Sequence, residues 1–266
     1  MPILDVAASA ALMDELTGIT ARAAETILDL AKTGDTRTKA DGSPVTAADE
    51  AAEAVICEGL QRLAPDIPII AEEQAGRARP KSIERGSYFL VDPLDGTQEF
   101  IAGSHEYTVN IAIVTDRLPI LGVIAAPASG LAWRGIVGRG AEKLEFPGGK
   151  TSPIHTRRRP AHEPVIMVSR SHLEARTRAY VDGHAPAKLV ACGSSVKFCR
   201  LAEGLADLYP RLAPTHDWDI AAGHAILTAA GGRVSTPDGS PLVYGTSELL
   251  IPGFIASGDP AAPITA

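Results

Sequence analysis

The stretch Tyr88-Phe-Leu-Val-Asp-Pro-Leu-Asp-Gly-Thr97 is an apolar run that stops at two carboxylates three residues apart. Residues 88–91 have the aromatic and β-branched content of a short buried strand. A proline and a glycine follow at once, and this pair predicts a turn directly after the strand. Asp92 and Asp95 are therefore expected to share one small turn at the C-terminal end of the strand.

Two carboxylates held this close repel each other, so both stay ionised only when a cation lies between them. No His or Cys stands in this stretch, and hard oxygen ligands alone suit Mg²⁺ or Mn²⁺. The carbonyl of Leu94, between the two aspartates, supplies a further oxygen. The alternative is a solvated Asp-Pro-x-Asp-Gly turn at the surface, which is common for Asp-Gly alone. The full strand-then-turn string favours the metal site.

The residues before this stretch predict two helices. Apolar residues recur at helical spacing over the first thirty-odd positions and predict one long amphipathic helix. They are Met13, Leu16, Ile19, Ala23, Ile27 and Leu30. Residues 35–44 are typical of a loop or a loose hairpin, and a second helix is expected from Val45 to about Leu63. Thr46 followed by Asp49 resembles a capping box, which by itself explains both residues.

Polar groups follow the predicted strands on both sides of the acidic turn. The short strand Ile67–Ala71 ends in Glu72 and Glu73. A glutamate pair is usually a solvated edge, but adjacent strand ends are also where open sheets gather ligand groups. Thr97–Ile101 predicts the start of a helix, whose unpaired N–H groups form an anion site. Gly96 would let a phosphate approach the backbone closely.

The rest of the chain predicts a sheet followed by alternating strands and helices. Tyr107–Val114 and Ile120–Ala125 predict an antiparallel hairpin, and residues 133–137 and 143–146 continue the sheet. Strands are then expected at 165–168, 188–191, 206–209, 233–235 and 249–256, and helices at 173–182, 195–204 and 218–230. Such alternation indicates an α/β unit. The Gly-, Pro- and Arg-rich segment 147–160 predicts the boundary between an N-terminal α+β domain, 1–150, and a C-terminal α/β domain, 151–266.

Length and composition limit the kinds of partner. The 266 residues suffice for two ordinary domains, and the formal net charge is −7. A net acidic chain has no general attraction for nucleic acid or an anionic membrane, so neither is expected as a partner. Cys57, Cys192 and Cys199 have no CxxC spacing and argue against a disulfide framework or a zinc site. The sequence shows no leader or membrane-spanning pattern and predicts a cytoplasmic protein.

Three further places could complete a site at the acidic turn. Asp219 begins a predicted helix, where it either caps the helix or projects a third carboxylate toward the metal. Gly193-Ser-Ser-Val-Lys197 joins a strand to a helix, and its hydroxyls and lysine suit a phosphate, although such links are common without any ligand. Arg211 follows a strand end and is either a second phosphate clamp or a surface charge. Ser169-Arg-Ser-His172 also follows a strand.

Together these residues resemble the inositol monophosphatase-like, lithium-sensitive phosphatase superfamily over nearly the whole chain. The resemblance rests on Glu72-Glu73, Asp92-Pro-Leu-Asp-Gly-Thr97 and Trp218-Asp219 in this order and spacing. Further stretches resemble its CysQ-type 3′(2′),5′-bisphosphate nucleotidase branch: Asp41-Gly-Ser-Pro-Val-Thr-Ala-Ala-Asp49, Thr97-Gln-Glu-Phe100, Gly193-Ser-Ser-Val-Lys-Phe-Cys199 and Trp218-Asp-Ile-Ala-Ala-Gly-His224. Gln98 departs from the lysine usual in that branch, and Ala71 from its usual Ser or Gly.

The resemblance implies a layered α-β-α-β-α sandwich and a Mg²⁺-dependent phosphatase. Two or three Mg²⁺ ions, with Mn²⁺ as the alternative, would be held by Glu72, Asp92, Asp95, Asp219 and the Leu94 carbonyl. The catalytic residues would be Asp49, Glu72 and Thr97, with Asp49 and Thr97 activating the attacking water. Gly96 and Thr97 would bind the scissile phosphate, and the second phosphate or the nucleoside would be bound by His172, Ser194, Ser195, Lys197 and Arg211. Inhibition by Li⁺ is also implied.

The expected substrate is a small phosphorylated molecule, adenosine 3′,5′-bisphosphate and also its 5′-phosphosulfate analogue, in sulfur metabolism. The first alternative is an inositol monophosphatase or a fructose 1,6-bisphosphatase, although a single-phosphate substrate has no use for Lys197 and Arg211. The second alternative is a nucleotide sensor that binds without catalysis, which the presence of Asp49 and Thr97 disfavours. Monomer and homodimer both remain open.

Overall fold

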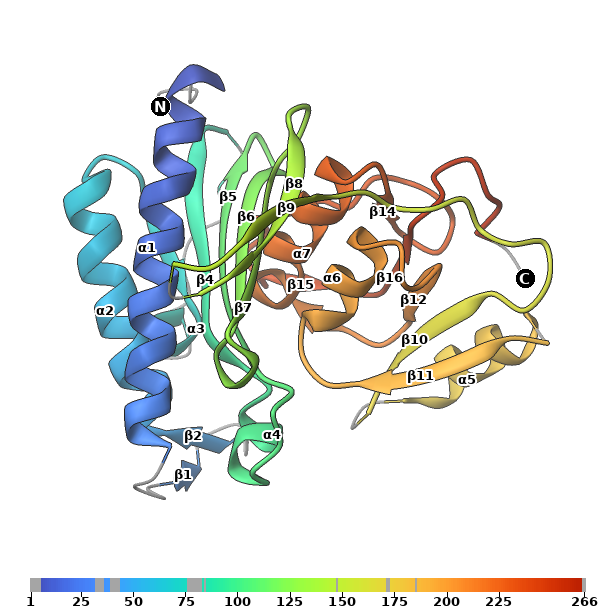
Figure 1. Ribbon diagram of the computed structural model, residues 1–266, viewed down its shortest axis with the longest axis horizontal. Coiled ribbons are helices and arrows are strands. Elements are labelled where there is room, and N and C mark those ends of the chain that lie inside the picture. Colours follow the sequence, from blue (N-terminus) through green and yellow to red (C-terminus); the bar gives the residue numbers. More distant parts are fainter. Residues whose placement is uncertain are drawn as a thin grey trace.

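Five layers in the order α-β-α-β-α form the molecule (Figure 1). The computed structural model describes residues 6–31, 36–38, 44–75, 83, 85–146, 148–170, 173–184 and 186–264. The layered sandwich predicted from the sequence is confirmed. Within the part of the chain that is described, no helix is both long and apolar enough to cross a membrane.

The first sheet has the strand order β3-β4-β5-β6-β7-β8-β9. Its strands are β3 (Ile69–Ala71), β4 (Ser87–Asp95), β5 (Thr108–Thr115), β6 (Leu118–Ala126), β7 (Leu131–Ile136), β8 (Gly140–Glu145) and β9 (Thr151–Ile154). β3 and β4 are parallel and the other neighbours are antiparallel. The predicted hairpin and its continuation are therefore confirmed.

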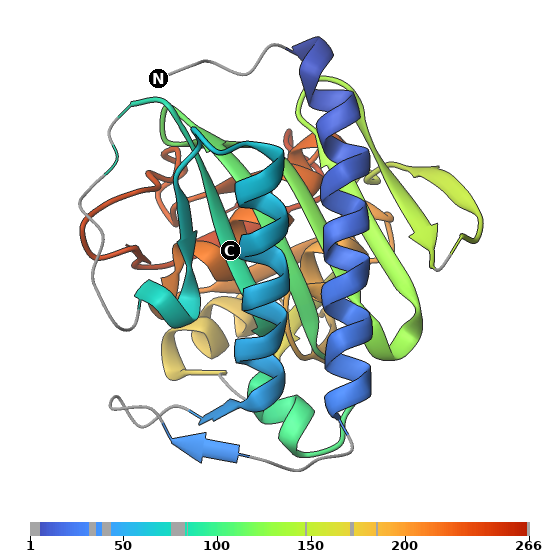
Figure 2. The ribbon, with the colours of Figure 1, turned by 90° about the vertical axis from the view of Figure 1, so that its left-hand side faces the viewer.

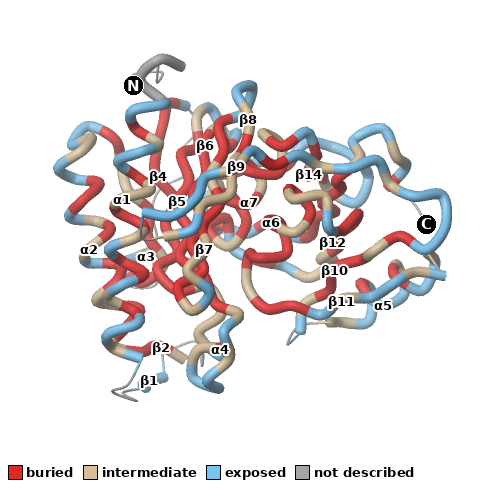
Figure 3. The backbone as a smooth tube through the Cα atoms, viewed as in Figure 1, coloured by how far each residue is buried: buried red, intermediate tan, exposed pale blue. Residues whose placement is uncertain are grey.

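Helices α1 (Val6–Leu30) and α2 (Ala47–Leu63) lie side by side over one face of this sheet (Figure 2). Successive side chains of a strand point to opposite faces. Phe89 and Val91 accordingly belong to the core beneath α1 and α2, while Tyr88 and Leu90 belong to the second core. Figure 3 shows the strands of the first sheet as largely buried. Burial on both faces explains why β4 is a continuous apolar run rather than an alternating one.

The opposite face of the first sheet is covered by α7 (Asp217–Ala229), with α6 (Val196–Ala202) beside it. Two glycines of the sheet let α7 approach closely. A Cβ atom at Gly122 would lie 2.3 Å from the carbonyl oxygen of Ala222, and one at Gly135 would lie 2.9 Å from the Cβ of Ala229. These contacts fix the middle and the C-terminal end of α7 against the sheet whose strand β4 carries the acidic residues.

The second sheet has the order β11-β10-β12-β16-β14. Its strands are β10 (Val165–Ser169), β11 (Lys188–Cys192), β12 (Leu208–Arg211), β14 (Arg233–Ser235) and β16 (Phe254–Ser257), and α5 (Ala175–Asp182) forms the outer layer. β10 is parallel to β11 and β12, and β16 is antiparallel to β12 and β14. The alternating strands and helices predicted for this half are therefore present, with one difference. The single strand predicted at 249–256 is two strands in different sheets, β15 (Leu250–Ile251) and β16.

Short elements complete the fold. They are β1 (Thr36–Thr38), β2 (Pro44–Thr46), α3 (Glu72–Ala75), α4 (Thr97–Ile101), η1 (Pro127–Ser129), β13 (Thr215–His216) and β15 (Leu250–Ile251). The antiparallel pairing of β1 with β2 fits the loose hairpin that was predicted, of which residues 39–43 lie outside the described part.

The predicted turn immediately after Val91 is wrong. β4 continues through Pro93 to Asp95, and its pairing with β5 shifts register between Asp92 and Asp95. The two aspartates therefore lie in a bulged strand end rather than in a free turn, and a bulge of this kind changes the direction of the side chains it carries. The division into domains at 150 and 151 stays a prediction, although β9 adds to the first sheet.

Candidate active site

A pocket of about 180 Å³ opens where the first sheet and α7 meet the second sheet. Nine of the residues predicted for the site line it: Glu72, Asp95, Gly96, Thr97, Ser194, Ser195, Lys197, Arg211 and Asp219. They are up to 147 positions apart in the sequence, so the pocket brings together residues from both halves of the chain. His172 lies outside the described residues.

Three carboxylates that line this pocket, Glu72, Asp95 and Asp219, act on a fourth carboxylate, that of the buried Asp92. Asp92 is only 1% exposed, and its pKa is raised well above the ordinary value by burial and then by Glu72, Asp95 and Asp219. The backbone N–H of Leu94 donates to Asp92 Oδ1 at 3.0 Å and partly offsets this rise. The predicted acidic cluster is therefore close enough in space to interact strongly.

The Asp95 carboxylate has both negatively and positively charged neighbours. Burial and then Asp219 raise its pKa to about 6, while Lys197 and Arg211 act in the opposite direction. Asp95 thus interacts both with another carboxylate and with the two cations of the pocket. A phosphate group in this pocket would meet cations as well as carboxylates able to bind a metal ion.

Asp219 caps the first turn of α7. Its Oδ2 accepts hydrogen bonds from the hydroxyl of Thr215 and, at 3.1 Å, from the backbone N–H of His216. The capping role considered from the sequence is therefore real. It does not exclude a site role, because Asp219 also raises the pKa of both Asp92 and Asp95.

The donor set fits a hard divalent cation by its chemistry. All of its side chains are carboxylates, and burial with mutual repulsion makes their charged forms costly unless a cation compensates. Among the described residues, no three His, Cys, Asp or Glu side chains are already arranged closely enough to hold an ion. Binding would therefore have to draw these carboxylates together.

Asp49 lies beside the pocket, and its two carboxylate oxygens have different hydrogen-bond partners. Oδ2 accepts from the backbone N–H and the hydroxyl of Thr46, at 2.7 and 2.6 Å, as in the predicted capping box. Oδ1 lies 3.0 Å from the hydroxyl oxygen of Thr97, which donates to it or to the carbonyl of Leu94 at 3.1 Å. The structure therefore joins Asp49 to Thr97 across 48 positions of the chain.

The Gly193-Ser-Ser turn lies on the other side of the pocket, before α6. Ser194 has a φ of +46°, a conformation that residues other than glycine rarely adopt. The hydroxyl of Ser195 donates to Asn110 Oδ1 at 2.7 Å and is 2.9 Å from the hydroxyl of Thr108. Sequence reasoning missed both β5 partners. A buried Asn and a buried Thr in an apolar strand were the signal that could have revealed them.

Lys197, which the sequence resemblance assigns to the second phosphate, also has hydrogen-bond partners within the protein. Its Nζ donates to the carbonyl oxygens of Ser194 and Cys192, at 2.5 and 3.1 Å, and lies 5.1 Å from the centre of the Tyr209 ring. Lys197 is 3% exposed and yet lines the pocket. It therefore places a positive charge at the site while holding the Gly193-Ser-Ser turn from inside.

Arg211 ends β12 and faces the same pocket. Burial lowers its pKa, but the nearby Tyr209, Asp219 and Asp95 outweigh this, so the pKa is raised. Arg211 stays cationic, and its Nε is a buried atom with no hydrogen-bond partner among the described residues. Such a donor favours an acceptor-rich ligand such as a phosphate.

The fold agrees with comparisons to known proteins. Residues 4–260 match the model of the inositol monophosphatase family, and the chain belongs to that family. The resemblance stated from the sequence is thereby confirmed.

The comparisons also support the predicted branch. A protein named 3′(2′),5′-bisphosphate nucleotidase CysQ from Shigella flexneri is 43% identical over 251 residues, which cover 92% of this chain and 99% of the relative. Its namesake from Haemophilus influenzae is 32% identical over 225 residues, covering 83% and 82%. The crystal structure of CysQ from Bacteroides thetaiotaomicron aligns with a TM-score of 0.78 at 34% identity, over 93% of this chain and 97% of the other. IMPase from Thermotoga maritima has the same TM-score at 22% identity and supports the fold alone.

Proposed function

We propose that this protein is a metal-dependent phosphomonoesterase that removes the 3′-phosphate of adenosine 3′,5′-bisphosphate, giving adenosine 5′-monophosphate and phosphate. The observation that carries the proposal is one pocket lined by both carboxylates and cations. The carboxylates are Glu72, Asp95 and Asp219, and the cations are Lys197 and Arg211. Similarity to proteins named bisphosphate nucleotidases supports the choice of substrate.

The proposed metal site consists of Glu72, Asp92, Asp95, Asp219 and the carbonyl of Leu94. When bound there, Mg²⁺ or Mn²⁺ would lower the pKa of the attacking water and neutralise charge on the scissile phosphate. Burial and neighbouring carboxylates raise the pKa of Asp92 and Asp95. A bound cation would offset this cost, which supports a metal ion at this place. The number of ions, two or three, stays a prediction.

Asp49 and Thr97 are the proposed pair that handles the proton of the attacking water. Thr97 Oγ1 is 3.0 Å from Asp49 Oδ1, so the hydroxyl can accept a hydrogen bond from water and pass its own proton to the carboxylate. Thr46 holds the second oxygen of Asp49 and thereby fixes the orientation of the carboxylate. Gly96, with a φ of +96°, and Thr97 begin α4 beside this pair, and their backbone N–H groups are the proposed donors to the scissile phosphate.

The second phosphate would lie beside Lys197 and Arg211, the two cations that line the pocket. Arg211 offers an unpartnered buried donor there, and Ser194 carries a buried hydroxyl oxygen with no partner among the described residues. Lys197 adds positive charge from below. A substrate with one phosphate leaves these groups unsatisfied, which disfavours the inositol monophosphatase alternative.

The test is a phosphate-release assay with adenosine 3′,5′-bisphosphate, inositol 1-phosphate and fructose 1,6-bisphosphate, each with Mg²⁺ and with chelator. The proposal requires the highest specificity constant on the adenosine bisphosphate and loss of turnover in chelator. Preference for inositol 1-phosphate would favour the first alternative. Tight binding of the bisphosphate without turnover would favour a nucleotide sensor. Hydrolysis of the 5′-phosphosulfate analogue and inhibition by Li⁺ are measured in the same assay.

A further inference from the structure

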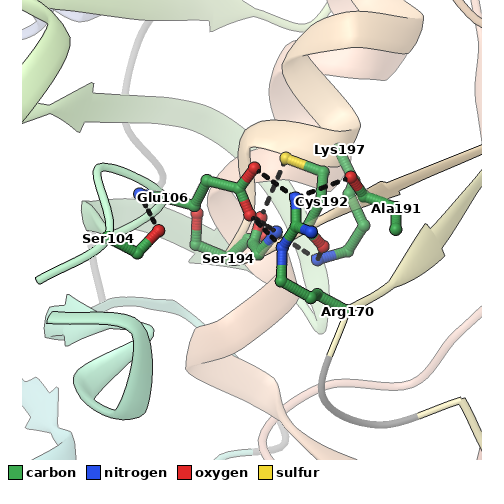
Figure 4. Close-up of polar contacts among 8 residues, drawn as sticks. Ser104, Glu106, Arg170, Ala191, Cys192, Ser194 and Lys197 are labelled. Atoms are coloured by element: carbon green, nitrogen blue, oxygen red, sulfur yellow. Dashed lines mark hydrogen bonds and ion pairs between the residues drawn. The ribbon is translucent and has the colours of Figure 1, made fainter. Parts of the chain in front are cut away.

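Glu106 and Arg170 form an ion pair that links the segment before β5 of the first sheet to the end of β10 in the second sheet (Figure 4). Glu106 lies between α4 and β5, and Arg170 directly follows β10. Arg170 Nε donates to Glu106 Oε2 at 2.8 Å, and Nη2 donates to Oε1 at 2.7 Å. Nη2 also donates to the carbonyl oxygen of Ala191 on β11, at 3.1 Å. The contact therefore ties the loop after α4 to two neighbouring strands of the second sheet.

The same carboxylate holds the Gly193-Ser-Ser turn from outside. The backbone N–H of Gly193 donates to Glu106 Oε2 at 2.7 Å. The next residue, Ser194, has the unfavourable φ of +46° described above. Such a backbone conformation persists only where its surroundings over-determine it. Glu106 outside the turn and Lys197 inside it supply two such restraints.

The backbone of Glu106 also packs against both site loops. A Cβ atom built on Gly96 would lie 3.0 Å from the carbonyl oxygen of Glu106, and one built on Gly193 would lie 2.7 Å from it. Glu106 therefore lies between the loop proposed to bind the scissile phosphate and the turn proposed to face the second phosphate. The position of Glu106 therefore helps to set the distance between these two loops.

We propose that Glu106 and Arg170 are positioning residues that fix the spacing between the two proposed phosphate sites and so select substrates with two phosphates. The inference rests on the proposed function and deepens it. A plain surface ion pair is the competing explanation. The Glu106 side chain is 28% exposed and that of Arg170 is 52% exposed, so such a pair contributes little to stability by itself. Stability and selectivity are therefore separable readouts.

The first variant is Glu106→Ala, assayed on adenosine 3′,5′-bisphosphate and adenosine 3′-monophosphate. Its specificity constant should fall about tenfold on the bisphosphate, mainly through KM, and about twofold or less on the monophosphate, because one charge-assisted contact is lost at the turn. The ratio of the two specificity constants is the decisive quantity. Unchanged selectivity in a folded variant overturns the inference.

Two more variants separate the ion pair from the contact with Gly193. In Glu106→Gln the amide oxygen can still accept from Gly193, so the ratio should fall only about threefold.

In Glu106→Arg combined with Arg170→Glu the charges are exchanged, but the side chain at 106 can no longer accept that hydrogen bond. The exchange should therefore fail to restore selectivity, and full restoration would overturn the role of Gly193. Should Glu106→Ala not fold, the Gln variant decides: an unchanged ratio refutes the inference.

Glu142→Ala is the matched control. Glu142, a part-exposed carboxylate like Glu106, accepts through Oε2 from Nε and Nη2 of Arg134, at 3.1 and 3.0 Å. This pair joins β7 to β8 and makes no contact with the Gly193-Ser-Ser turn. Its loss should leave the selectivity ratio unchanged, and an equal drop there would show that Glu106 acts only through general stability. A wild-type protein that hydrolyses neither nucleotide would instead refute the proposed function itself.

Discussion

Replacement of Asp95 by Asn should stabilise the metal-free protein. In the folded state Asp95 lies among carboxylates, and burial with Asp219 raises its pKa from 3.8 to about 6. Its ionised form is thus less favourable in the folded chain than in the unfolded chain. Asn keeps the size and the acceptor oxygen of the side chain but carries no charge, so this cost disappears.

The size of the effect follows from the pKa. One pKa unit corresponds to about 1.4 kcal/mol, so a shift of about two units gives an upper limit of about 3 kcal/mol. Solvent around this partly exposed side chain screens the charge, and we expect a gain of about 1–2 kcal/mol. For a chain of this length each kcal/mol raises Tm by about 2–4 °C.

The pH dependence has a definite sign. Because the folded pKa is the higher one, protonation of Asp95 stabilises the protein fully below 3.8, and this contribution is lost as the pH rises through 6. The advantage of Asp95→Asn should therefore be complete above pH 7 and should shrink steadily from pH 6 toward pH 4. Thermal melts in chelator over this range measure it.

Adding Mg²⁺ should change the order of stability. A cation that binds the folded state alone stabilises it by mass action, and the wild type has one more carboxylate to bind it. A gain for the variant that is independent of pH, or a loss of stability at pH 8 in chelator, would refute the reasoning. Asp207→Asn serves as the control, because Asp207 accepts two hydrogen bonds at 2.8 Å from Arg157. This replacement should destabilise the protein both with and without Mg²⁺.

Three further predictions concern single residues. Asp49→Ala should reduce turnover by at least about 100-fold, because a general base typically contributes that much. Substrate binding, measured by calorimetry, should remain. Wild-type turnover in this variant would show that Asp49 only caps its helix. Lys197→Ala should lose roughly 1.5–3 kcal/mol of transition-state stabilisation on the bisphosphate and far less on adenosine 3′-monophosphate, whereas equal losses would assign Lys197 to the scaffold alone. Burial lowers the pKa of His224 from 6.5 to about 4, so the free energy of unfolding should decrease as the pH falls from 6.5 to 4. His224→Gln should remove this contribution and flatten the plot of stability against pH in that range. An unchanged slope between pH 6.5 and 4 in the variant would contradict the prediction.

Local patterns predicted most of the fold but not the end of β4. The apolar content of residues 88–91 identified the strand because burial on both faces demands it. Pro93 and Gly96 were interpreted as a turn, yet Asp95 pairs with Thr108 beyond a shift in register. Pairing with β5 depends on a strand elsewhere in the chain, so tertiary context decided where β4 ends.

The site was predictable to the extent that its residues stand in recognisable strings. Glu106 stands in none, and Arg170 stands in the segment 169–172 that follows a strand but was given no role there. Their contact spans 64 positions, so neither residue identifies the other in the sequence. Lys197 was recognised, but its hydrogen bonds to two carbonyl oxygens depend on the left-handed Ser194, which no local pattern predicts. Contacts that depend on both sheets at once cannot be deduced from either half alone.

Asp49 and Asp219 show why capping and chemistry need not compete. Each is the third residue of its helix, α2 or α7, and each uses Oδ2 to accept the backbone N–H of the residue before the first turn. The partial positive charge of a helix N-terminus favours an ionised carboxylate at this position. Because the cap fixes the side chain, the second oxygen of Asp49 is held ready for Thr97, and the charge of Asp219 is held beside Asp92 and Asp95. A helix cap therefore supplies the rigidity that a reactive carboxylate requires.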